Sequence, residues 1–276
     1  MAAALLRIVD PADPRIAAFT AIRERDLTGR EGRFVAEGTV VLNMLASVHG
    51  GKTGFRAEAL LLLENRIAGL EKLLERFPPN VPAYVADANV FDRIAGFHMH
   101  RGVLAIGVKP QDAAVEAVIA GLPETSLVLV ASGIANHDNI GAMFRNAAAF
   151  GADAVLLDST CCDPLYRKAI RVSVGAVLAM PHAREGRTEE HLERLAAAGF
   201  DIWALSPRGS VRIGDIPASR RVALVVGTEG EGLPERIMQR FRTARVPQAP
   251  GLDSLNVATA SGVALYQMAL AAGRLG

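Results

Sequence analysis

An apolar, β-branched run covers residues 221–226 and stops at a glycine-rich loop, Gly227-Thr-Glu-Gly-Glu-Gly-Leu-Pro234. Such a run bounded by glycine is typical of a buried parallel strand. Glycine beyond the carboxyl end of a strand lets the backbone turn sharply and approach a ligand closely. Because open α/β sheets bind ligands at this edge, the stretch predicts a parallel sheet with a ligand-binding loop.

A second loop of this kind follows soon after. A short apolar run at 244–246 leads into Gly251-Leu-Asp-Ser-Leu-Asn256, which opens a long apolar helix. Ser254 and Asn256 are side chains that cap helices, and the N–H groups at a helix start favour polar or anionic partners. Two ligand-ready loops therefore lie close together, although ordinary strand-to-helix turns with ordinary caps are the alternative interpretation.

The rest of the chain alternates between short apolar runs and helical patterns, which favours an α/β fold. The first part predicts strands at 57–63, 81–85 and 103–108 and helices around 40–45, 67–76 and 91–95. The second part predicts strands at 127–131, 154–157, 176–180, 202–205, 223–226 and 244–246 and helices at 140–150, 189–198 and 234–241. Two prolines interrupt the segment between these parts. We therefore expect a small α/β domain at 1–108, a linker at 109–124 and a parallel-sheet domain at 125–276.

Composition restricts the class of protein. The chain of 276 residues is half hydrophobic, so it can bury two cores, and its net charge of +1 gives no bulk electrostatic argument for nucleic-acid binding. Arg23, Arg25, Arg30 and Arg33 form a local basic cluster, which is either a solvated face or a phosphate-contacting patch. We expect a soluble, cytoplasmic protein with reduced thiols, because the start lacks a secretion signal, no apolar run could span a membrane, and adjacent cysteines rarely pair.

Several common kinds of active site are absent from the sequence. No G-x-G-x-x-G or P-loop follows the first strand of either half, and Ser132 lacks the surroundings of a nucleophile elbow. Cys161 and Cys162 are read as packing residues. His98 and His100 have no further metal ligand at a suitable spacing, so we expect no metal site.

Three ordered motifs make the chain similar to a known family. They are Asn139-x-Gly141-x-x-x-Arg145, Gly227-Thr-Glu-Gly-x-Gly-Leu233 and Val246-Pro-x-x-x-Gly251-x-x-Ser254-Leu-Asn256-Val. In this order they resemble the SpoU (TrmH) family of RNA 2′-O-ribose methyltransferases. The resemblance covers nearly the whole chain, most strongly 125–272, and it extends to 100–105, 163–168 and 171–175.

The resemblance implies a fold that pattern reading alone does not propose. The catalytic domain would be a parallel α/β sheet with a C-terminal trefoil knot, the SPOUT class, which departs from the usual rules of chain connection. The N-terminal domain would be a small, ribosomal-protein-like α/β module that presents RNA. Members bind S-adenosylmethionine bent among the knot loops, and they are typically homodimers.

The resemblance also implies roles for individual residues. Arg145 would position the RNA phosphate and stabilise the developing alkoxide, and Glu229 would orient Arg145 or the ligand. Asn139, Ser254 and Asn256 complete the expected catalytic set. The cofactor would lie against Leu205, Ser206, Gly227, Glu229, Gly232, Val246, Leu255 and Asn256, and RNA would contact Arg30, Arg33 and Arg145.

Two features refine these expectations. Gln248-Ala-Pro250 stands where members often have methionine followed by a small residue, so Pro250 could alter the loop over the cofactor. The chain ends soon after its last helix, without the basic extension of some tRNA-modifying members, which favours rRNA over tRNA. Tyr266 on that helix is expected in the core.

The alternatives are an RNA-binding assembly factor without catalysis and an unrelated α/β enzyme acting on small molecules.

Overall fold

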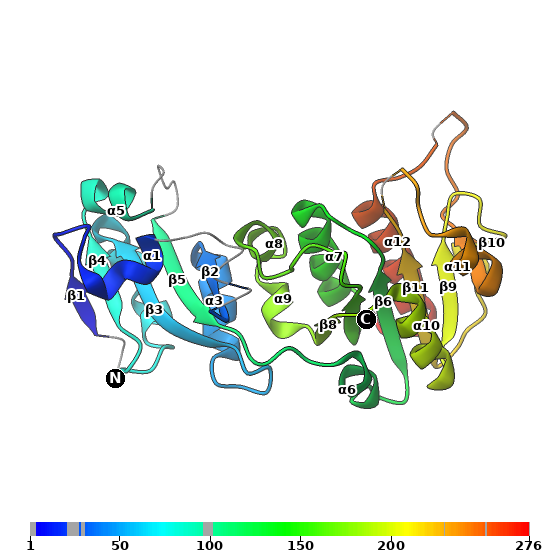
Figure 1. Ribbon diagram of the computed structural model, residues 1–276, viewed down its shortest axis with the longest axis horizontal. Helices are drawn as coiled ribbons and strands as arrows, with labels where there is room; N and C mark the ends of the chain where they lie inside the picture. Colours follow the sequence, from blue (N-terminus) through cyan, green and yellow to red (C-terminus); the bar gives the residue numbers. More distant parts are fainter. Residues whose placement is uncertain are drawn as a thin grey trace. The chain divides into compact units, whose positions relative to one another are not determined.

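The computed structural model of the chain describes residues 4–20, 28, 31–95, 102–228, 230–251 and 253–275. The chain divides into two compact units (Figure 1). Unit 1 is Met1–Gln111 with Leu165–Ala179, and unit 2 is Asp112–Pro164 with Met180–Gly276. The segment 165–179 therefore packs with the N-terminal part of the chain although it lies within the range expected for the second domain. Most of the predicted linker, from Asp112 onward, lies in unit 2.

The described residues of unit 1 form a five-stranded mixed sheet in the order β1-β4-β3-β5-β2. β1, β4 and β3 are parallel, and β5 runs antiparallel to both β3 and β2. The strands are β1 (Leu5–Arg7), β2 (Arg33–Glu37), β3 (Arg56–Leu63), β4 (Ala83–Ala86) and β5 (Val103–Val108). The three strands predicted in this region are present, and β1 and β2 are additional.

Helices pack around this sheet. They are η1 (Pro14–Ile16), α1 (Ala17–Thr20), α3 (Thr39–Val48), η2 (Glu64–Gly69), α4 (Glu71–Leu74), α5 (Ala88–Ala95), α8 (Arg167–Val172) and α9 (Ala176–Ala179). One core cluster joins Phe19 and Phe91 to strand residues such as Leu61 and Ile106, all of which are buried. Alternation along the strands sends their other apolar side chains to the face where α3 packs.

The described residues of unit 2 form a seven-stranded, fully parallel sheet in the order β10-β12-β9-β11-β6-β7-β8. The strands are β6 (Ser126–Ala131), β7 (Ala154–Leu157), β8 (His182–Arg184), β9 (Asp201–Leu205), β10 (Val211–Arg212), β11 (Arg221–Val226) and β12 (Arg242–Arg245). The central strands are buried on both faces, which explains why they read as continuous apolar runs.

Helices cover both faces of the parallel sheet (Figure 1). Helices α6, α10 and α11 share one core cluster with β6, β9 and β11. Helices α7 and α12 pack against one another and against β6, β7 and β11. Their bounds are α6 (Val115–Ala120), α7 (His137–Ala149), α10 (Thr188–Ala197), η3 (Ile213–Asp215), α11 (Glu235–Arg240) and α12 (Val257–Ala271). The predicted α/β class with a parallel sheet is confirmed.

The strand predicted at 176–180 is wrong, because residues 176–179 form helix α9. A run of four or five apolar residues does not by itself distinguish a strand from a buried helix, and alanine and leucine favour the helix. Val174 and Gly175 adopt positive φ and turn the chain sharply out of α8, and α9 then packs against α3. The parallel strand of this region is β8, which begins after Pro181.

Tyr266 is also placed differently from the expectation, since it is 47% exposed rather than part of the core. Its ring packs edge-on against Phe150, with 5.6 Å between ring centroids. An apolar helix is buried all round only if it is enclosed, and α12 leaves one face open. Within the described part of the chain, every helix is too short or too polar to cross a lipid bilayer.

Candidate active site

The predicted site residues of unit 2 follow four strands that are neighbours in the sheet, β12, β9, β11 and β6. Because these strands are parallel, their carboxyl ends lie at one edge, where α/β proteins bind ligands. Asn139 and Arg145 follow β6, Leu205 and Ser206 follow or end β9, Gly227 and Gly232 follow β11, and Val246, Ser254, Leu255 and Asn256 follow β12. Glu229 follows β11 but lies outside the described residues.

The loop after β11 folds back on itself. The N–H of Gly232 donates to the carbonyl of Thr228 at 3.1 Å, and the two residues form an isolated antiparallel bridge. Gly227 is buried beneath this turn, and a Cβ there would overlap the backbone of Gly232. Gly232 itself adopts a φ of +74°, which favours glycine. The sequence of glycines therefore encodes one tight, closed turn at the end of β11.

The loop after β9 is held against β12. The N–H of Ser206 donates to the carbonyl of Ala244 at 2.9 Å, and a Cβ at Gly209 would overlap the Ala244 backbone. The Arg245 guanidinium donates to the carbonyl of Ser210 at 3.0 Å. Leu205, the last residue of β9, is half-buried at this edge. These hydrogen bonds fix the ends of β9 and β12, where the predicted cofactor contacts lie, relative to one another.

One hydrogen bond connects the first and third sequence motifs. Asn256 caps α12, and its Oδ1 accepts the N–H groups of Ala258 and Thr259 at 2.9 and 3.2 Å. Its Nδ2 donates to Oδ1 of Asn139 at 3.0 Å, and Asn139 is buried in the first turn of α7. The two asparagines thus fix the start of α12 against the start of α7.

A second amide strengthens this junction. Nδ2 of Asn146 donates to the carbonyl of Ala258 at 2.8 Å, and a Cβ at Gly262 would come within 2.8 Å of the same amide. Asn146 thereby packs α7 tightly on α12. Sequence reasoning assigned no role to it, because its partner is a backbone carbonyl more than a hundred residues away.

Arg145 lies on the exposed side of α7, one residue before this junction. No hydrogen bond or ion pair joins its guanidinium to another described residue, and the same holds for the exposed hydroxyl of Ser254. The expected pairing of Arg145 with Glu229 stays a prediction, because Glu229 is not described. A charged guanidinium without a protein partner is available to an anionic ligand such as a phosphate.

A buried carboxylate that sequence reasoning missed supports the loop before α7. Asp158 follows β7, is 6% exposed, and accepts the Gly133 N–H at 3.1 Å. It also accepts hydroxyl hydrogen bonds from Thr160 at 2.6 Å and Thr188 at 2.7 Å. Burial would raise the pKa of Asp158, but these hydrogen bonds outweigh it and hold the pKa below its usual value. Asp158 therefore remains a carboxylate that fixes the loop between β6 and α7.

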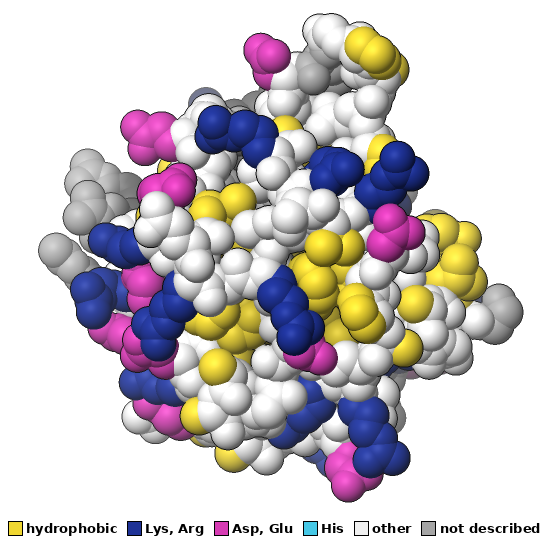
Figure 2. Space-filling view, turned by 90° about the vertical axis from the view of Figure 1, so that its right-hand side faces the viewer, with side chains coloured by type: hydrophobic (Ala, Val, Ile, Leu, Met, Phe, Trp, Pro, Cys, Tyr) yellow, Lys and Arg dark blue, Asp and Glu magenta, His cyan; other side chains and the backbone are white. Residues whose placement is uncertain are grey.

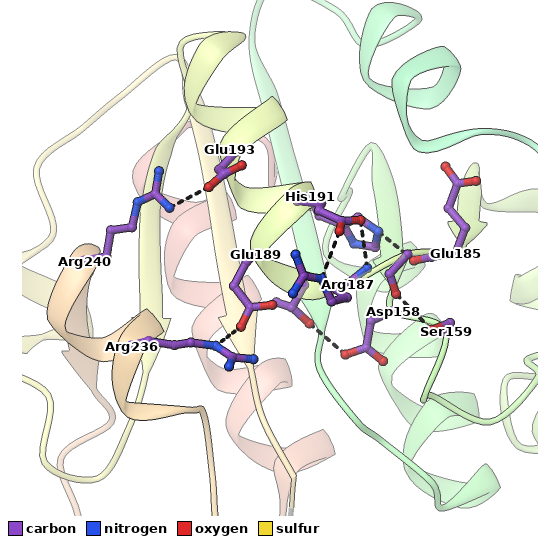
Figure 3. A network of polar contacts seen from close by, with 12 residues as sticks. Asp158, Ser159, Glu185, Arg187, Glu189, His191, Glu193, Arg236 and Arg240 are labelled. Atoms are coloured by element: carbon purple, nitrogen blue, oxygen red, sulfur yellow. Dashed lines mark hydrogen bonds and ion pairs between the residues drawn. The ribbon is translucent and has the colours of Figure 1, made fainter.

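Ion pairs hold the element that follows the β11 loop. Figure 3 shows Arg236 and Arg240 of α11 reaching Glu189 and Glu193 of α10. The Arg240–Glu193 distance is 2.6 Å, and its partners are both more than half exposed. Exposed pairs contribute little each, so we assign them the orientation of α11 rather than a large share of the stability.

The two cysteine thiols both have raised pKa values. Burial raises the pKa of Cys161 to about 12 and that of Cys162 to about 11. The Cys161 thiol accepts the N–H of Ile134 at 3.3 Å and donates to the carbonyl of Ala131 at 3.4 Å. A protonated, buried thiol is a poor nucleophile, which agrees with the packing role expected from the sequence.

The predicted RNA contacts of unit 1 are only partly described. Arg33 in β2 donates to both carboxylate oxygens of Glu58 at 2.8 Å and pairs with Glu31 at 3.1 Å. A phosphate would have to compete with these carboxylates for the guanidinium. Arg30, His98 and His100 lie outside the described residues. In the described part of the chain, no three His, Cys, Asp or Glu side chains lie close enough together to hold a metal ion.

Unit 2 is thus a parallel α/β unit with closed loops at its carboxyl edge, the arrangement in which proteins of the α/β class bind ligands. The family model described as the SpoU rRNA Methylase family matches residues 126–266. An uncharacterized tRNA/rRNA methyltransferase of Mycobacterium tuberculosis is 37% identical over 270 residues, which are 94% of this chain and 90% of that protein. The chain therefore belongs to this family of RNA methyltransferases.

Two solved structures are similar along almost their whole length. The AdoMet-bound rRNA methyltransferase of Sinorhizobium meliloti is 25% identical with a TM-score of 0.75, and the match covers 96% of this chain and 97% of that chain. A solved RNA 2′-O ribose methyltransferase is 26% identical with a TM-score of 0.76, and the match covers 98% and 100%. Both units of the chain thus follow the architecture of these two solved structures.

Proposed function

We propose that this protein transfers the methyl group of S-adenosylmethionine to a ribose 2′-hydroxyl of structured RNA, with rRNA favoured over tRNA. The observation that carries the proposal is the hydrogen bond between Asn139 and Asn256, which joins two of the three sequence motifs. Arg145 lies on the same helix as Asn139 and has no ion pair with a described residue. The AdoMet-bound relative supports the methyl donor, and the 2′-O ribose methyltransferase supports the position of transfer.

The carboxyl edge of the sheet fits such a donor. Gly230, Gly232 and Gly251 all have positive φ, and no atom lies within 4 Å of where a Cβ would stand. Their backbone is therefore open to close approach by a ligand. The residues that would hold the donor are Leu205, Ser206, Gly227, Glu229, Gly232, Val246, Leu255 and Asn256. When bound, S-adenosylmethionine supplies a methyl group activated by its positively charged sulfur.

The protein mainly has to align the 2′-hydroxyl and manage its proton. Arg145 binds the adjacent phosphate and stabilises negative charge on the attacking oxygen. Its guanidinium stays protonated in proteins, so it does not accept the proton itself, and a phosphate or another group would relay it. Asn139, Ser254 and Asn256 hold the loops in position, and Glu229 orients the guanidinium of Arg145.

We further propose that the active form is a homodimer with the trefoil knot of the SPOUT class. Val263, Tyr266 and Leu270 are 40%, 47% and 51% exposed, and their spacing places them on one face of α12. An apolar stripe of this kind supports association with a second copy. Arg30, Arg33 and Arg145 stay the predicted RNA contacts.

Charge distribution agrees with a local RNA contact rather than a broad one. Figure 2 shows Lys and Arg side chains spread over the side where β10 and α11 lie, with Asp and Glu among them. RNA affinity would then depend on a few positioned arginines, and its salt dependence would be shallow.

The test is calorimetric titration with S-adenosylmethionine, followed by transfer from labelled donor to separate rRNA and tRNA substrates. We expect binding, and a ribose-methylated nucleotide in the rRNA digest. Arg145→Ala should keep donor binding and lose transfer by about a hundredfold or more. Arg220→Ala is the matched control, since Arg220 is exposed at the opposite edge of the sheet.

Each part of the proposal has its own contrary result. Normal turnover by Arg145→Ala would refute the role proposed for Arg145. A methylated base in the digest would refute ribose transfer, and transfer to tRNA alone would refute the preference for rRNA. Absence of donor binding at millimolar concentration would exclude catalysis and favour an RNA-binding assembly factor.

A further inference from the structure

Helices α7 and α12 are joined by a series of contacts whose partners advance in the same direction along both helices. The contacts are Asn139–Asn256 at 3.0 Å, Asn146–Ala258 at 2.8 Å and Phe150–Tyr266 with 5.6 Å between ring centroids. The two helices therefore run side by side, and these contacts form the seam between them. The seam begins at the cap of α12, where the first and third sequence motifs meet.

Asn146 holds the middle of this seam. It stands seven residues after Asn139, which is nearly two turns, so both side chains lie on the face of α7 that meets α12. A Cβ at Gly262 of α12 would come within 2.8 Å of the Asn146 amide nitrogen. The amide thus reaches the backbone of α12 because Gly262 has no side chain.

The carbonyl that accepts this bond does not depend on it. The Ala258 carbonyl also accepts the Ser261 hydroxyl at 2.9 Å, so it keeps a side-chain partner without Asn146. A single neutral hydrogen bond adds little to stability, because the same groups bond to water in the unfolded chain. Apolar side chains of matching size could fill the same space. What distinguishes the Asn146 bond from such packing is its fixed direction.

Arg145 immediately precedes Asn146 and is exposed beside the seam. Because both residues belong to one helix, any rotation of α7 against α12 carries the Arg145 side chain with it. A helix with its side chains is about 10–12 Å across, so a rotation of about 10° moves the end of a side chain by about 1 Å. A misplacement of about 1 Å can lower the rate of a reaction about a hundredfold.

We infer that Asn146 is a positioning residue for methyl transfer: its bond to Ala258 fixes the rotation of α7 and so sets where the Arg145 guanidinium stands relative to the start of α12. This inference rests on the proposed function, in which Arg145 binds the phosphate and stabilises the attacking oxygen. Asn146 acts through Arg145 and needs no contact with donor or RNA. Donor binding depends on the loops after β9, β11 and β12, so loss of the Asn146 bond should leave it unchanged.

The experiment breaks the bond from both sides. Asn146→Ala removes the amide, and Gly262→Ala places a Cβ where the amide stands. At saturating donor and RNA, each variant should transfer methyl groups from labelled S-adenosylmethionine to total RNA at least about tenfold more slowly than the wild type. The calorimetric affinity of each for S-adenosylmethionine should stay within about twofold of the wild type.

Asn43→Ala is the matched control. Its side-chain amide also donates to a helix carbonyl, that of Thr39 at 3.0 Å, but it lies on α3 in unit 1. This variant should keep the transfer rate of the wild type.

The double variant Asn146→Ala/Gly262→Ala separates positioning from packing. Asn146→Ala alone should lower the melting temperature by about 2–4 °C. In the double variant the added Cβ occupies the space that the amide leaves, and alanine is preferred over glycine within a helix, so the melting temperature should recover. The transfer rate should stay low, because the directed bond is still missing. A role in packing alone predicts instead that the rate recovers together with the melting temperature.

The outcomes separate this inference from the proposed function. Recovery of the rate in the double variant, or unchanged rates in both single variants, would overturn the inference and leave the function standing. Donor binding that weakens in step with transfer would overturn it too, because the site as a whole would then be loosened. If Asn146→Ala does not fold, Gly262→Ala and the double variant decide. Absence of donor binding and transfer in the wild type and in Asn43→Ala would refute the proposed function itself.

Discussion

Asp158→Ala tests whether the buried carboxylate organises unit 2. The carboxylate accepts the Gly133 N–H at 3.1 Å and the Thr188 hydroxyl at 2.7 Å. The Cys161 N–H also reaches the backbone carbonyl of Asp158, so it keeps a partner in the variant. The half-buried Gly133 N–H and the buried hydroxyls of Ser132 and Thr188 lose their bonds to the carboxylate, and the Thr188 hydroxyl can turn to Ser132 at 2.8 Å. The exposed Thr160 can bond to water instead.

These contacts set the expected magnitude. A hydrogen bond to a charged group contributes about 1.5–3 kcal/mol to the free energy of unfolding, and a buried donor left without an acceptor lowers that free energy by about 1–3 kcal/mol. With two donors left without an acceptor, the Gly133 N–H and the Ser132 hydroxyl, and with Thr188 redirected, Asp158→Ala should lower the free energy of unfolding by about 3 kcal/mol. Asp215→Ala, an exposed control, should change it by less than about 0.5 kcal/mol.

The effect must depend on pH with a definite sign. Hydrogen bonds hold the pKa of Asp158 below its unfolded value of about 3.9, so the unfolded state binds the proton more readily. The contribution of the carboxylate is fully present above the unfolded pKa and is lost as pH falls through the lower, folded pKa. The difference in stability between wild type and Asp158→Ala should therefore shrink in acid and stay constant from pH 5 to 7.

Urea unfolding followed by tryptophan fluorescence is the assay. Trp203 is the only tryptophan of the chain and lies buried in β9, so its emission reports on unit 2. A loss below about 1 kcal/mol at pH 7, or a difference that grows in acid, would refute the role given to Asp158.

Two further predictions concern the loops around the site. Gly227→Ala should fold but lose affinity for the methyl donor by at least about tenfold, because its Cβ overlaps the Gly232 backbone and forces the turn open. The affinity is measured by calorimetry, with Gly214→Ala as the control because a Cβ has ordinary space there. Equal affinities of the two variants would contradict the prediction. At pH 8 iodoacetamide should leave Cys161 and Cys162 of the folded protein unlabelled for minutes but label both in urea. The reason is that burial raises the pKa of Cys161 to about 12 and that of Cys162 to about 11. Rapid labelling of the folded protein without urea would contradict this prediction.

Local chemistry made the loops predictable. The strand at 154–157 is present with the predicted bounds, because its apolar run stands between turn signals. The glycines after β11 and the Asn256 cap are equally local, and each occupies the predicted place. Helix α9 was missed for the opposite reason, since its four apolar residues take their conformation from the turn at Val174 and Gly175 and from packing on α3.

Polar contacts between distant segments were beyond the sequence. The donors around Asp158 come from the loop after β6, the loop after β7 and the start of α10. Nothing in the spacing of Gly133, Thr160 and Thr188 indicates that they converge. A buried carboxylate with so many donors follows only once β6 and β7 are paired and α10 is packed beside them.

The strand order explains why the loops of the candidate site could be recognised one by one in the sequence, but not their arrangement in space. Asn139 and Asn256 stand 117 positions apart in sequence, yet their side chains bond at 3.0 Å. They meet because β12 pairs with β9, β9 with β11, and β11 with β6, an order that the chain does not follow in sequence. The sequence of each loop is recognisable by itself, whereas the loops come together at one edge only after the four strands have paired. We conclude that changes to the pairing of β9 with β11 would disrupt the site as surely as changes to its side chains.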